Sequence, residues 1–223
     1  MSFSISHGRV LEVGNIGIAQ EDLPHYGAGP IDLRAWFGPE LSDRPLELEI
    51  GSGKGTFLIQ EAAIRQGTNF IGVEWAKAYW RYAADRCRRQ GLNNVRLVRI
   101  EADMFLRNYV SDCHFRAVHL YFPDPWPKKR HHKRRLVQEA FLRQLHRVIE
   151  DDGQVLITTD HRDYFHWMID HVDRLETSFR RCVFTRPESA GDGEVVGTNF
   201  ERKYRLEGRE FYGMRLVKIP IDA

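Results

Sequence analysis

The sequence predicts an α/β fold with a mostly parallel central sheet and helices on both faces, on the basis of three observations. From Pro45 onward, short apolar segments rich in β-branched and aromatic residues alternate with segments of helical periodicity. A chain of 223 residues can bury one sizeable core, and we expect one domain. Hydrophobic residues make up 42% and charged residues 29%, which excludes a disordered or fibrous chain.

The expected elements follow in chain order. We expect strands at residues 46–50, 69–74, 95–100, 116–122 and 154–159, since each is a short apolar segment. We expect helices at residues 56–66, 76–90, 133–150 and 161–175, the third closed by Gly153 after "EDD". After a turn-rich stretch, residues 200–206 and 210–219 are expected to form a C-terminal antiparallel strand pair.

The N-terminal segment carries the weakest pattern. Residues 1–44 contain several glycines and no clear periodicity, so we expect an N-terminal arm of uncertain order before a domain at 45–223. No segment has the roughly 18 to 20 consecutive apolar residues of a membrane span, and the first residues lack the apolar run of a secretory signal. A cytoplasmic protein with no membrane contact is the expectation.

Three widely spaced cysteines, Cys87, Cys113 and Cys182, form no C-x-x-C pair, and they predict neither a disulfide framework nor a zinc site. His131 and His132 are adjacent and no matching cluster of Cys or His follows, so we expect no metal.

The segment "LELEIGSGKGTFL" at 46–58 raises the question of which ligand its glycine loop holds. A phosphate loop of the G-x-x-x-x-G-K-[ST] kind needs glycine at 48 and a hydroxyl at 55, where the sequence has Leu48 and Gly55. A G-x-G-x-x-G dinucleotide loop needs glycine at 56, where Thr56 stands. Both interpretations are therefore disfavoured.

The loop fits a different pattern, acid-x-Gly-x-Gly-x-Gly, formed by Glu49, Gly51, Gly53 and Gly55. Glycines let the backbone approach a ligand, and the preceding acid can receive an ammonium group such as that of S-adenosylmethionine. Two more acids follow strand ends. Glu74 could accept hydrogen bonds from ribose hydroxyls, and Asp103 could accept one from the adenine amine. One such acid is usually solvated surface, but three at successive strand ends favour a cofactor site.

The segment "YFPDPWPKKRHHKRR" at 121–135 is the most specific in the chain. Prolines 123, 125 and 127 fix the backbone, so Asp124 and Trp126 are expected on a rigid loop after the fourth strand. Open α/β sheets bind ligands at this carboxyl edge. A tight turn capped by Asp124 is the structural alternative. For Trp126, stacking on a base and packing in the core are equally open.

The basic run at 128–135 contains six Lys or Arg and no acid, on a chain whose net charge is only +2. Alone, such a run is as often a solvated helix start as a functional surface. Beside the proline loop, it predicts several phosphate contacts with RNA.

Taken together, the acid and glycine loop, "GVE" ending in Glu74, "AD" at 102–103, the proline loop, "TTDHRDYFHWM" and "TNFE" at 198–201 resemble the bacterial tRNA (guanine-N7)-methyltransferase family. The resemblance runs from about Pro45 to the C-terminus. It implies a Rossmann-like class I methyltransferase fold, S-adenosylmethionine as the cofactor, tRNA as the partner and methylation of a variable-loop guanine at N7.

The resemblance also implies site residues. Cofactor positions fall on Glu49, Gly51, Gly53, Gly55, Glu74, Asp103 and Asp124, with Asp124 also catalytic. Substrate positions fall on Lys128, Asp160, Thr198, Asn199, Phe200 and Glu201, and RNA-contacting positions on Arg130, His131, His132, Lys133, Arg134 and Arg135. Asp160 could equally cap the helix that follows it. The tail from 202 onward does not match closely, and the sequence leaves a monomer and a homodimer open.

Guanine N7 has an in-plane lone pair and no proton, so its methylation needs no obligatory base, and the protein's task is alignment and charge management. Asp124 could accept hydrogen bonds from guanine N1 and N2 and stabilise the developing positive charge. Two alternatives remain open. One is methylation of an exocyclic base amine, whose enzymes carry an Asp-Pro-Pro-aromatic segment that differs from Pro-Asp-Pro-Trp here. The other is an RNA-binding module without activity.

Overall fold

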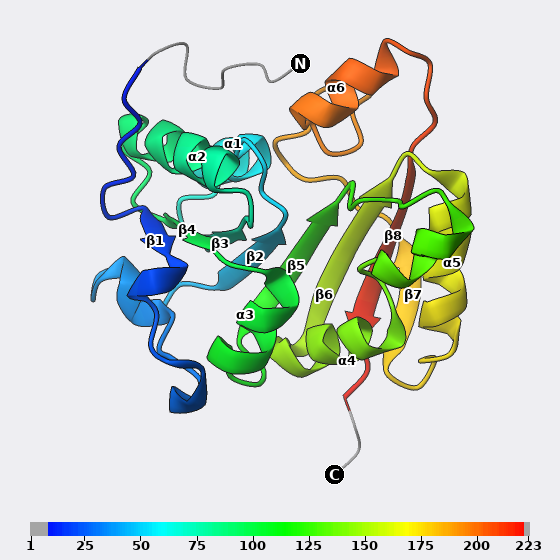
Figure 1. The fold of residues 1–223 in the computed structure, drawn as a ribbon, viewed down its shortest axis with the longest axis horizontal. Helices are drawn as coiled ribbons and strands as arrows, with labels where there is room; N and C mark the ends of the chain where they lie inside the picture. Colours follow the sequence, from blue (N-terminus) through cyan, green and yellow to red (C-terminus); the bar gives the residue numbers. More distant parts are fainter. Residues whose placement is uncertain (1–8, 221–223) are drawn as a thin grey trace. The chain divides into compact units, whose positions relative to one another are not determined.

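The computed structural model describes residues 9–220, and these fall into two compact units, one ending at Val110 and one beginning at Ser111. Figure 1 follows the chain from the N-terminal unit, coloured blue through cyan to green, to the C-terminal unit, coloured green to red. Each unit is an α/β structure with its own strands and helices. Residues 1–8 of the expected N-terminal arm lie outside the described residues.

The first unit contains four parallel strands in the order β1-β4-β3-β2 (Figure 1). Every residue of β2 and β3 is buried, as expected for parallel strands covered on both faces. The strands are β1 (Gly17–Ala19), β2 (Leu46–Ile50), β3 (Asn69–Val73) and β4 (Val95–Arg99), and the helices are α1 (Thr56–Ile64), α2 (Lys77–Arg89) and α3 (Ala102–Tyr109).

Residues 9–44 are part of this first unit. Strand β1 pairs in parallel with β4, and Leu33 and Phe37 are buried. Short 3-10 turns occupy Gln20–Asp22, Tyr26–Ala28 and Arg34–Phe37. These elements are too short to carry the periodicity by which helices and strands are recognised in a sequence.

The second unit contains four strands in the order β5-β6-β8-β7. Strands β5 and β6 are parallel, whereas β8 is antiparallel to both β6 and β7. The strands are β5 (Phe115–Tyr121), β6 (Ile149–Thr159), β7 (Phe179–Val183) and β8 (Tyr212–Lys218), and the helices are the 3-10 helix η4 (Lys129–Arg134), α4 (Glu139–Val148), α5 (Arg162–Asp173) and α6 (Asn199–Arg205). The expected α/β class, mostly parallel with a C-terminal antiparallel pair, is confirmed.

The expected strand at 200–206 is wrong, because these residues form α6. The Thr198 side chain accepts a hydrogen bond from the Glu201 amide and caps the helix. The antiparallel partner of β8 is instead β7, which the sequence analysis did not propose. The T-x-x-E pattern at 198–201 is a signal for a helix start, and the expectation of a strand overlooked it.

The expected helix at 133–150 is also too long. The helix α4 covers only Glu139–Val148, and β6 begins at the next residue. The "EDDG" segment does not close the helix but lies inside β6, where the register with β5 shifts between Phe115 and Ala117. A Cβ on Gly153 would lie 2.6 Å from the Glu150 carbonyl oxygen, so this irregularity requires glycine. Helix α3 was missed, although Glu101 caps it through the Asp103 and Met104 amides.

Candidate functional site

The glycine loop of the first unit joins the buried strand β2 to the helix α1. Gly51, Gly53 and Gly55 all have positive φ, between 52° and 77°, which non-glycine residues rarely adopt. Gly55 also packs closely, since a Cβ there would lie 2.9 Å from the Ala83 Cβ atom of α2. At Gly51 a Cβ would meet nothing within 4 Å, so the loop backbone is open to a ligand.

Glu49 lies on β2, two residues before the loop, and its side chain is only 4% exposed. Its Oε2 atom has no hydrogen-bond partner among the described residues. Burial, with a smaller contribution from the nearby Glu74 charge, raises the pKa of Glu49 to about 8. A buried acceptor without a donor is costly unless a ligand supplies one. The residues therefore fit a cationic ligand group beside the glycine loop.

Glu74 follows β3 and fixes the shape of the loop. One carboxylate oxygen accepts the Gly53 amide at 2.8 Å, and the other accepts the Ala76 amide at the same distance. Each oxygen has a second lone pair, so Glu74 can still accept ligand hydroxyls. Arg86 of α2 supports the same loop by donating to the Lys54 carbonyl at 2.6 Å. This arginine was not predicted as a site residue.

Asp103 lies in the first turn of α3, where its carboxylate pairs with Arg107 at 2.6 Å. This pair is partly exposed, so one face of the carboxylate remains accessible. Trp75 was not among the predicted site residues, although it directly follows Glu74 and its side chain is 63% exposed. The sequence signal that could have indicated Trp75 was a large aromatic residue next to an acid at the end of a predicted strand.

The proline loop of the second unit begins where β5 ends. Phe122 donates its amide to the Thr158 carbonyl of β6 at 2.9 Å. Phe122 and Trp126 have φ values of 54° and 42°, a left-handed conformation that costs a side-chain-bearing residue about 1–2 kcal/mol. Asp124 is exposed, and it has no hydrogen bond or ion pair within residues 9–220. The turn that Asp124 was expected to cap as an alternative is therefore not formed through its side chain.

Trp126 is half-buried and packs within the basic run. Its ring lies edge-on to His131 with centroids 5.9 Å apart, and the Arg134 guanidinium lies 4.9 Å over it. Trp126 is therefore neither a core residue nor a ring that is free to stack on a base.

The basic run forms the 3-10 helix η4 instead of the start of an α-helix. Lys128, Arg130, Lys133 and Arg134 are exposed. His131 and His132 are half-buried, and His132 packs edge-on against Trp167 of α5. The run therefore presents cations to solvent on one side and anchors itself to α5 on the other.

Arg135 differs from the rest of the run because its side chain is only 1% exposed. Its Nε atom donates to the Pro125 carbonyl at 2.9 Å, and its Nη2 atom pairs with Asp163. The guanidinium also lies 5.0 Å from the Tyr164 ring centroid and 5.1 Å from that of Trp167. In this structure Arg135 is not accessible to a phosphate, contrary to the sequence expectation.

Asp160 follows β6, and its side chain is 11% exposed. Its carboxylate pairs with Arg209 at 2.6 Å. The alternative role of Asp160 as a helix cap is wrong, because the His161 side chain accepts the Tyr164 amide at the start of α5. Arg209 lies in the tail that the sequence analysis could not match.

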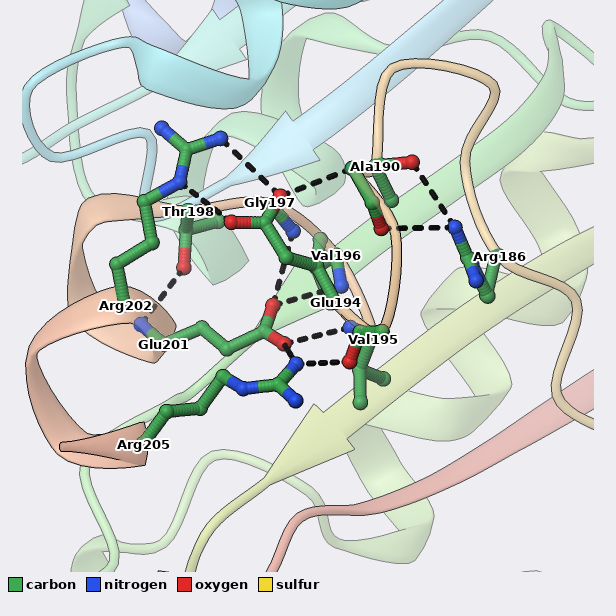
Figure 2. Close-up of polar contacts among 12 residues, drawn as sticks. Arg186, Ala190, Glu194, Val195, Val196, Gly197, Thr198, Glu201, Arg202 and Arg205 are labelled. Atoms are coloured by element: carbon green, nitrogen blue, oxygen red, sulfur yellow. Dashed lines mark hydrogen bonds and ion pairs between the residues drawn. The ribbon is translucent and has the colours of Figure 1, made fainter. Parts of the chain in front are cut away.

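Glu201 was expected to contact substrate, but its carboxylate is already engaged, as Figure 2 shows. It is fully buried, and it accepts the amides of Val195, Val196 and Gly197 at 2.5 to 2.9 Å. Arg205 of the same helix lies 3.4 Å from its Oε1 atom. Glu201 therefore holds the loop that leads into α6.

The loop before α6 has a second polar network, also drawn in Figure 2. Glu194 pairs with Arg202 at 2.6 Å and accepts the Gly191 amide at 2.9 Å. Arg186 donates to the Ala190 and Gly191 carbonyls. The segment from 186 to 205 is thus fixed largely by its own polar contacts.

Phe200 joins this segment to the proline loop. Its ring stacks on Phe122 with centroids 4.8 Å apart, and 38% of the residue remains exposed. Thr198 and Asn199 flank it at the start of α6. The structure thus brings Phe200 close to the residue two positions before Asp124.

Within residues 9–220, no cluster of three His, Cys, Asp or Glu side chains could hold a metal ion. In the same part of the chain, none of the helices combines the length and the apolar character that crossing a membrane requires.

Comparison with known proteins identifies relatives across most of the chain. Residues 43–214 match a family described as "Putative methyltransferase". A tRNA (guanine-N(7)-)-methyltransferase of Thermus thermophilus is 37% identical over 198 residues, covering 86% of this chain and 61% of that protein. A protein of the same name from Staphylococcus saprophyticus is 34% identical over 182 residues, covering 82% of this chain and 84% of that protein.

Solved structures share the fold at low sequence identity. An rRNA methylase of Streptococcus thermophilus has a TM-score of 0.53 at 13% identity, covering 80% of this chain and 89% of that chain. An aminoglycoside resistance methyltransferase has a TM-score of 0.55 at 15% identity, covering 83% and 93%. Both are Rossmann-like methyltransferases, which confirms the expected fold. By the family match and the identity to its relatives, the chain belongs to the bacterial tRNA (guanine-N7)-methyltransferase family.

Proposed function

We propose that this protein transfers the methyl group of S-adenosylmethionine to N7 of guanine 46 in the variable loop of tRNA. The observation that carries the cofactor assignment is the buried Glu49 carboxyl group beside an open glycine loop, because its Oε2 atom has no donor among the described residues. The substrate assignment is supported by the name that the relatives carry. We assign residues 45–223 to the methyltransferase domain and residues 1–44 to an N-terminal arm, whose strand β1 extends the sheet of the first unit by pairing with β4.

In the first unit, Glu49 would receive the ammonium group of the cofactor, and the backbone of Gly51, Gly53 and Gly55 would approach its amino-acid part. Glu74 would accept the ribose hydroxyls through its remaining lone pairs, and Asp103 the adenine amine. Bound there, S-adenosylmethionine supplies an electrophilic methyl group on a sulfonium.

In the second unit, Asp124 is proposed as the catalytic residue and as a further cofactor position. Its exposed carboxylate has no partner among the described residues 9–220 and can accept hydrogen bonds from guanine N1 and N2. A negative charge held there stabilises a ring that becomes cationic as N7 is methylated. The rigid backbone between Pro123 and Pro127 keeps this charge in position before the substrate arrives.

The remaining substrate positions act in two ways. Lys128, Asp160, Thr198, Asn199 and Phe200 are proposed to contact the substrate, with the exposed Phe200 ring offering a face on which a base could stack. Glu201 is proposed to act indirectly, because its carboxylate is occupied by three backbone amides.

The exposed cations Arg130, Lys133 and Arg134 are proposed to bind tRNA phosphates, with His131 and His132 supporting them from half-buried positions. Replacing these three cations with Ala should weaken tRNA binding and reduce the slope of log affinity against log salt by about 0.7–0.9 for each lost contact. An unchanged slope would remove the run from the RNA interface. Cofactor affinity, measured on the same variant by calorimetry, serves as the control.

The test of the proposed function is transfer of a labelled methyl group from S-adenosylmethionine to unmodified tRNA transcripts, followed by borohydride and aniline cleavage at N7-methylguanine. We expect label at the variable-loop guanine and cleavage at that position. Label without cleavage would indicate an exocyclic amine instead. Measured cofactor binding with no transfer to any tRNA would contradict the proposal.

Asp124→Ala is expected to lower kcat about 100-fold or more, since it removes a preorganised charge at the reacting base. Cofactor binding of the variant should be measured alongside turnover, so that a loss of cofactor is not mistaken for a loss of chemistry. Near-normal turnover with cofactor bound would show that Asp124 is not catalytic.

As a tRNA-modifying enzyme the protein is proposed to act in the cytoplasm, as a monomer or a homodimer. Sedimentation of the free protein and of its tRNA complex would distinguish the two states.

A further inference from the structure

Arg135, the last residue of the basic run, has a different role from the exposed cations of the run. Its neighbours Lys133 and Arg134 are exposed, whereas the Arg135 side chain is almost completely buried. A buried guanidinium is retained only where its N–H groups and its charge are satisfied. The contacts that satisfy it therefore indicate what Arg135 does.

The first contact reaches the proline loop. The Arg135 Nε atom donates to the carbonyl of Pro125, which directly follows Asp124, at 2.9 Å. Proline 125 cannot donate a hydrogen bond of its own, so the loop has few backbone groups through which other elements could hold it. A hydrogen bond from a charged donor is among the strongest available for this purpose.

The other contacts reach α5. The Nη2 atom of Arg135 pairs with Asp163, and this contact lowers the pKa of the Asp163 carboxyl group. Tyr164 and Trp167 present their rings to the guanidinium at about equal distance, 5.0 and 5.1 Å to their centroids. One planar group thus links a rigid helix to the backbone beside Asp124.

The aromatic partners are themselves fixed. The Tyr164 hydroxyl accepts the Val137 amide at 3.1 Å, and the Trp167 indole donates to the Val137 carbonyl at 2.9 Å. Both contacts are made just after Arg135 in the chain, so the guanidinium is enclosed by groups that cannot easily move. Such enclosure gives a fixed reference point for the loop.

We infer that Arg135 is a positioning residue, which clamps the Pro123–Pro127 loop to α5 and thereby sets the position of Asp124, and that it is not a phosphate ligand. This inference rests on the proposed catalytic role of Asp124. Phe122 and Trp126 have a left-handed backbone conformation, and a strained loop relaxes unless surrounding contacts fix it. The contacts of Arg135 would keep the loop in this conformation.

The test compares Arg135→Lys and Arg135→Met with Arg134→Ala. Lysine keeps the charge but cannot reproduce the planar fork that reaches both Pro125 and Asp163. We expect each Arg135 variant to lower kcat about 10- to 100-fold, the range expected for a small displacement of a catalytic group, with little change in KM for tRNA. Arg134→Ala should instead raise KM and reduce the salt dependence of tRNA binding. The exposed Arg174→Ala, whose side chain pairs with Glu139, is the matched control and should change neither.

A second comparison separates positioning from general stability. In an Asp124→Ala background, Arg135→Lys should lower kcat by less than threefold further, because the group that it positions is gone. A full additional loss in that background would overturn the inference. So would Arg135→Lys that raised KM and flattened the salt dependence as Arg134→Ala does, since Arg135 would then bind phosphate.

A third readout does not depend on any substrate. Amide hydrogen exchange of Phe122, whose amide donates to the Thr158 carbonyl, should be faster in Arg135→Lys than in wild type, while exchange within α4 should be unchanged. Unchanged protection of the loop would contradict the clamp even if the protein methylated nothing. If Arg135→Met fails to fold, Asp163→Asn offers a milder loss of the same link, and the same acceleration in the loop is expected.

Discussion

Two glutamates of this protein, Glu201 and Glu49, are almost equally buried but differ in their hydrogen-bond partners. Glu201 in the second unit accepts three backbone amides and lies beside Arg205. Glu49 in the first unit has an oxygen with no partner among the described residues, and burial raises its pKa to about 8. Burial alone therefore does not distinguish a structural acid from a ligand-binding one. The partners do, because a carboxylate that the chain leaves unsatisfied is available to a ligand.

The largest effect is expected for Glu201, the structural acid, on the stability of the fold. Glu201→Ala leaves the amides of Val195, Val196 and Gly197 without an acceptor, and a buried unpaired donor costs about 1–3 kcal/mol. We expect the free energy of unfolding to fall by about 3 kcal/mol or more. Denaturant unfolding would measure this, with the exposed Glu176→Ala as the control. A loss below about 1 kcal/mol would show that solvent replaces the carboxylate.

The next effect falls on the ligand-binding side. Glu49→Gln removes the charge that would pair with the cofactor ammonium, and a hydrogen bond between charged groups is worth about 1.5–3 kcal/mol. Affinity for S-adenosylmethionine should therefore fall about 10- to 100-fold, measured by calorimetry. The folded state should not be destabilised, because glutamine resembles the protonated acid. Equal affinity in the two proteins would remove Glu49 from the cofactor site.

A further effect concerns the stability of the free protein as pH changes. The folded pKa of Glu49 is raised, so the folded state binds this proton more tightly than the unfolded chain. Its contribution is fully present below pH 4.5 and is lost as pH rises towards about 8. Across that window the wild type should lose up to about 1.4 kcal/mol per pH unit relative to Glu49→Gln. Parallel curves for the two proteins would mean that Glu49 is not perturbed.

In the first unit, strands β2 and β3 and the glycine loop could be predicted from sequence. The two strands are buried and appear as short apolar segments, and the residues of the glycine loop are nearly consecutive in the chain. Glu49 was identified as a candidate on that basis. Its missing partner could not be predicted, since that depends on which donors the fold brings near it. Strand β1 and helix α3 were not predicted.

The second unit was harder to predict because its polar side chains contact residues far apart in the chain. Asp160 pairs with Arg209, which is 49 residues away in the chain, and Arg135 pairs with Asp163, which is 28 residues away. A run of like charges predicts exposure, and nothing in "KKRHHKRR" indicates that its last arginine is buried. Helix α6 was predictable in principle, since Thr198 and Glu201 form a recognised helix-start pattern.

The comparison between the two glutamates is tested most directly by the protons released when S-adenosylmethionine binds. At pH 7 a carboxyl group with a pKa of about 8 is roughly nine-tenths protonated, and pairing with an ammonium group would ionise it. Calorimetry at pH 7 in buffers of different ionisation enthalpy counts these protons. The wild type should release about one proton more than Glu49→Gln, and Glu201→Gln should release as many as the wild type. Equal release by wild type and Glu49→Gln would contradict the assignment of Glu49 as the unsatisfied acid that receives the cofactor.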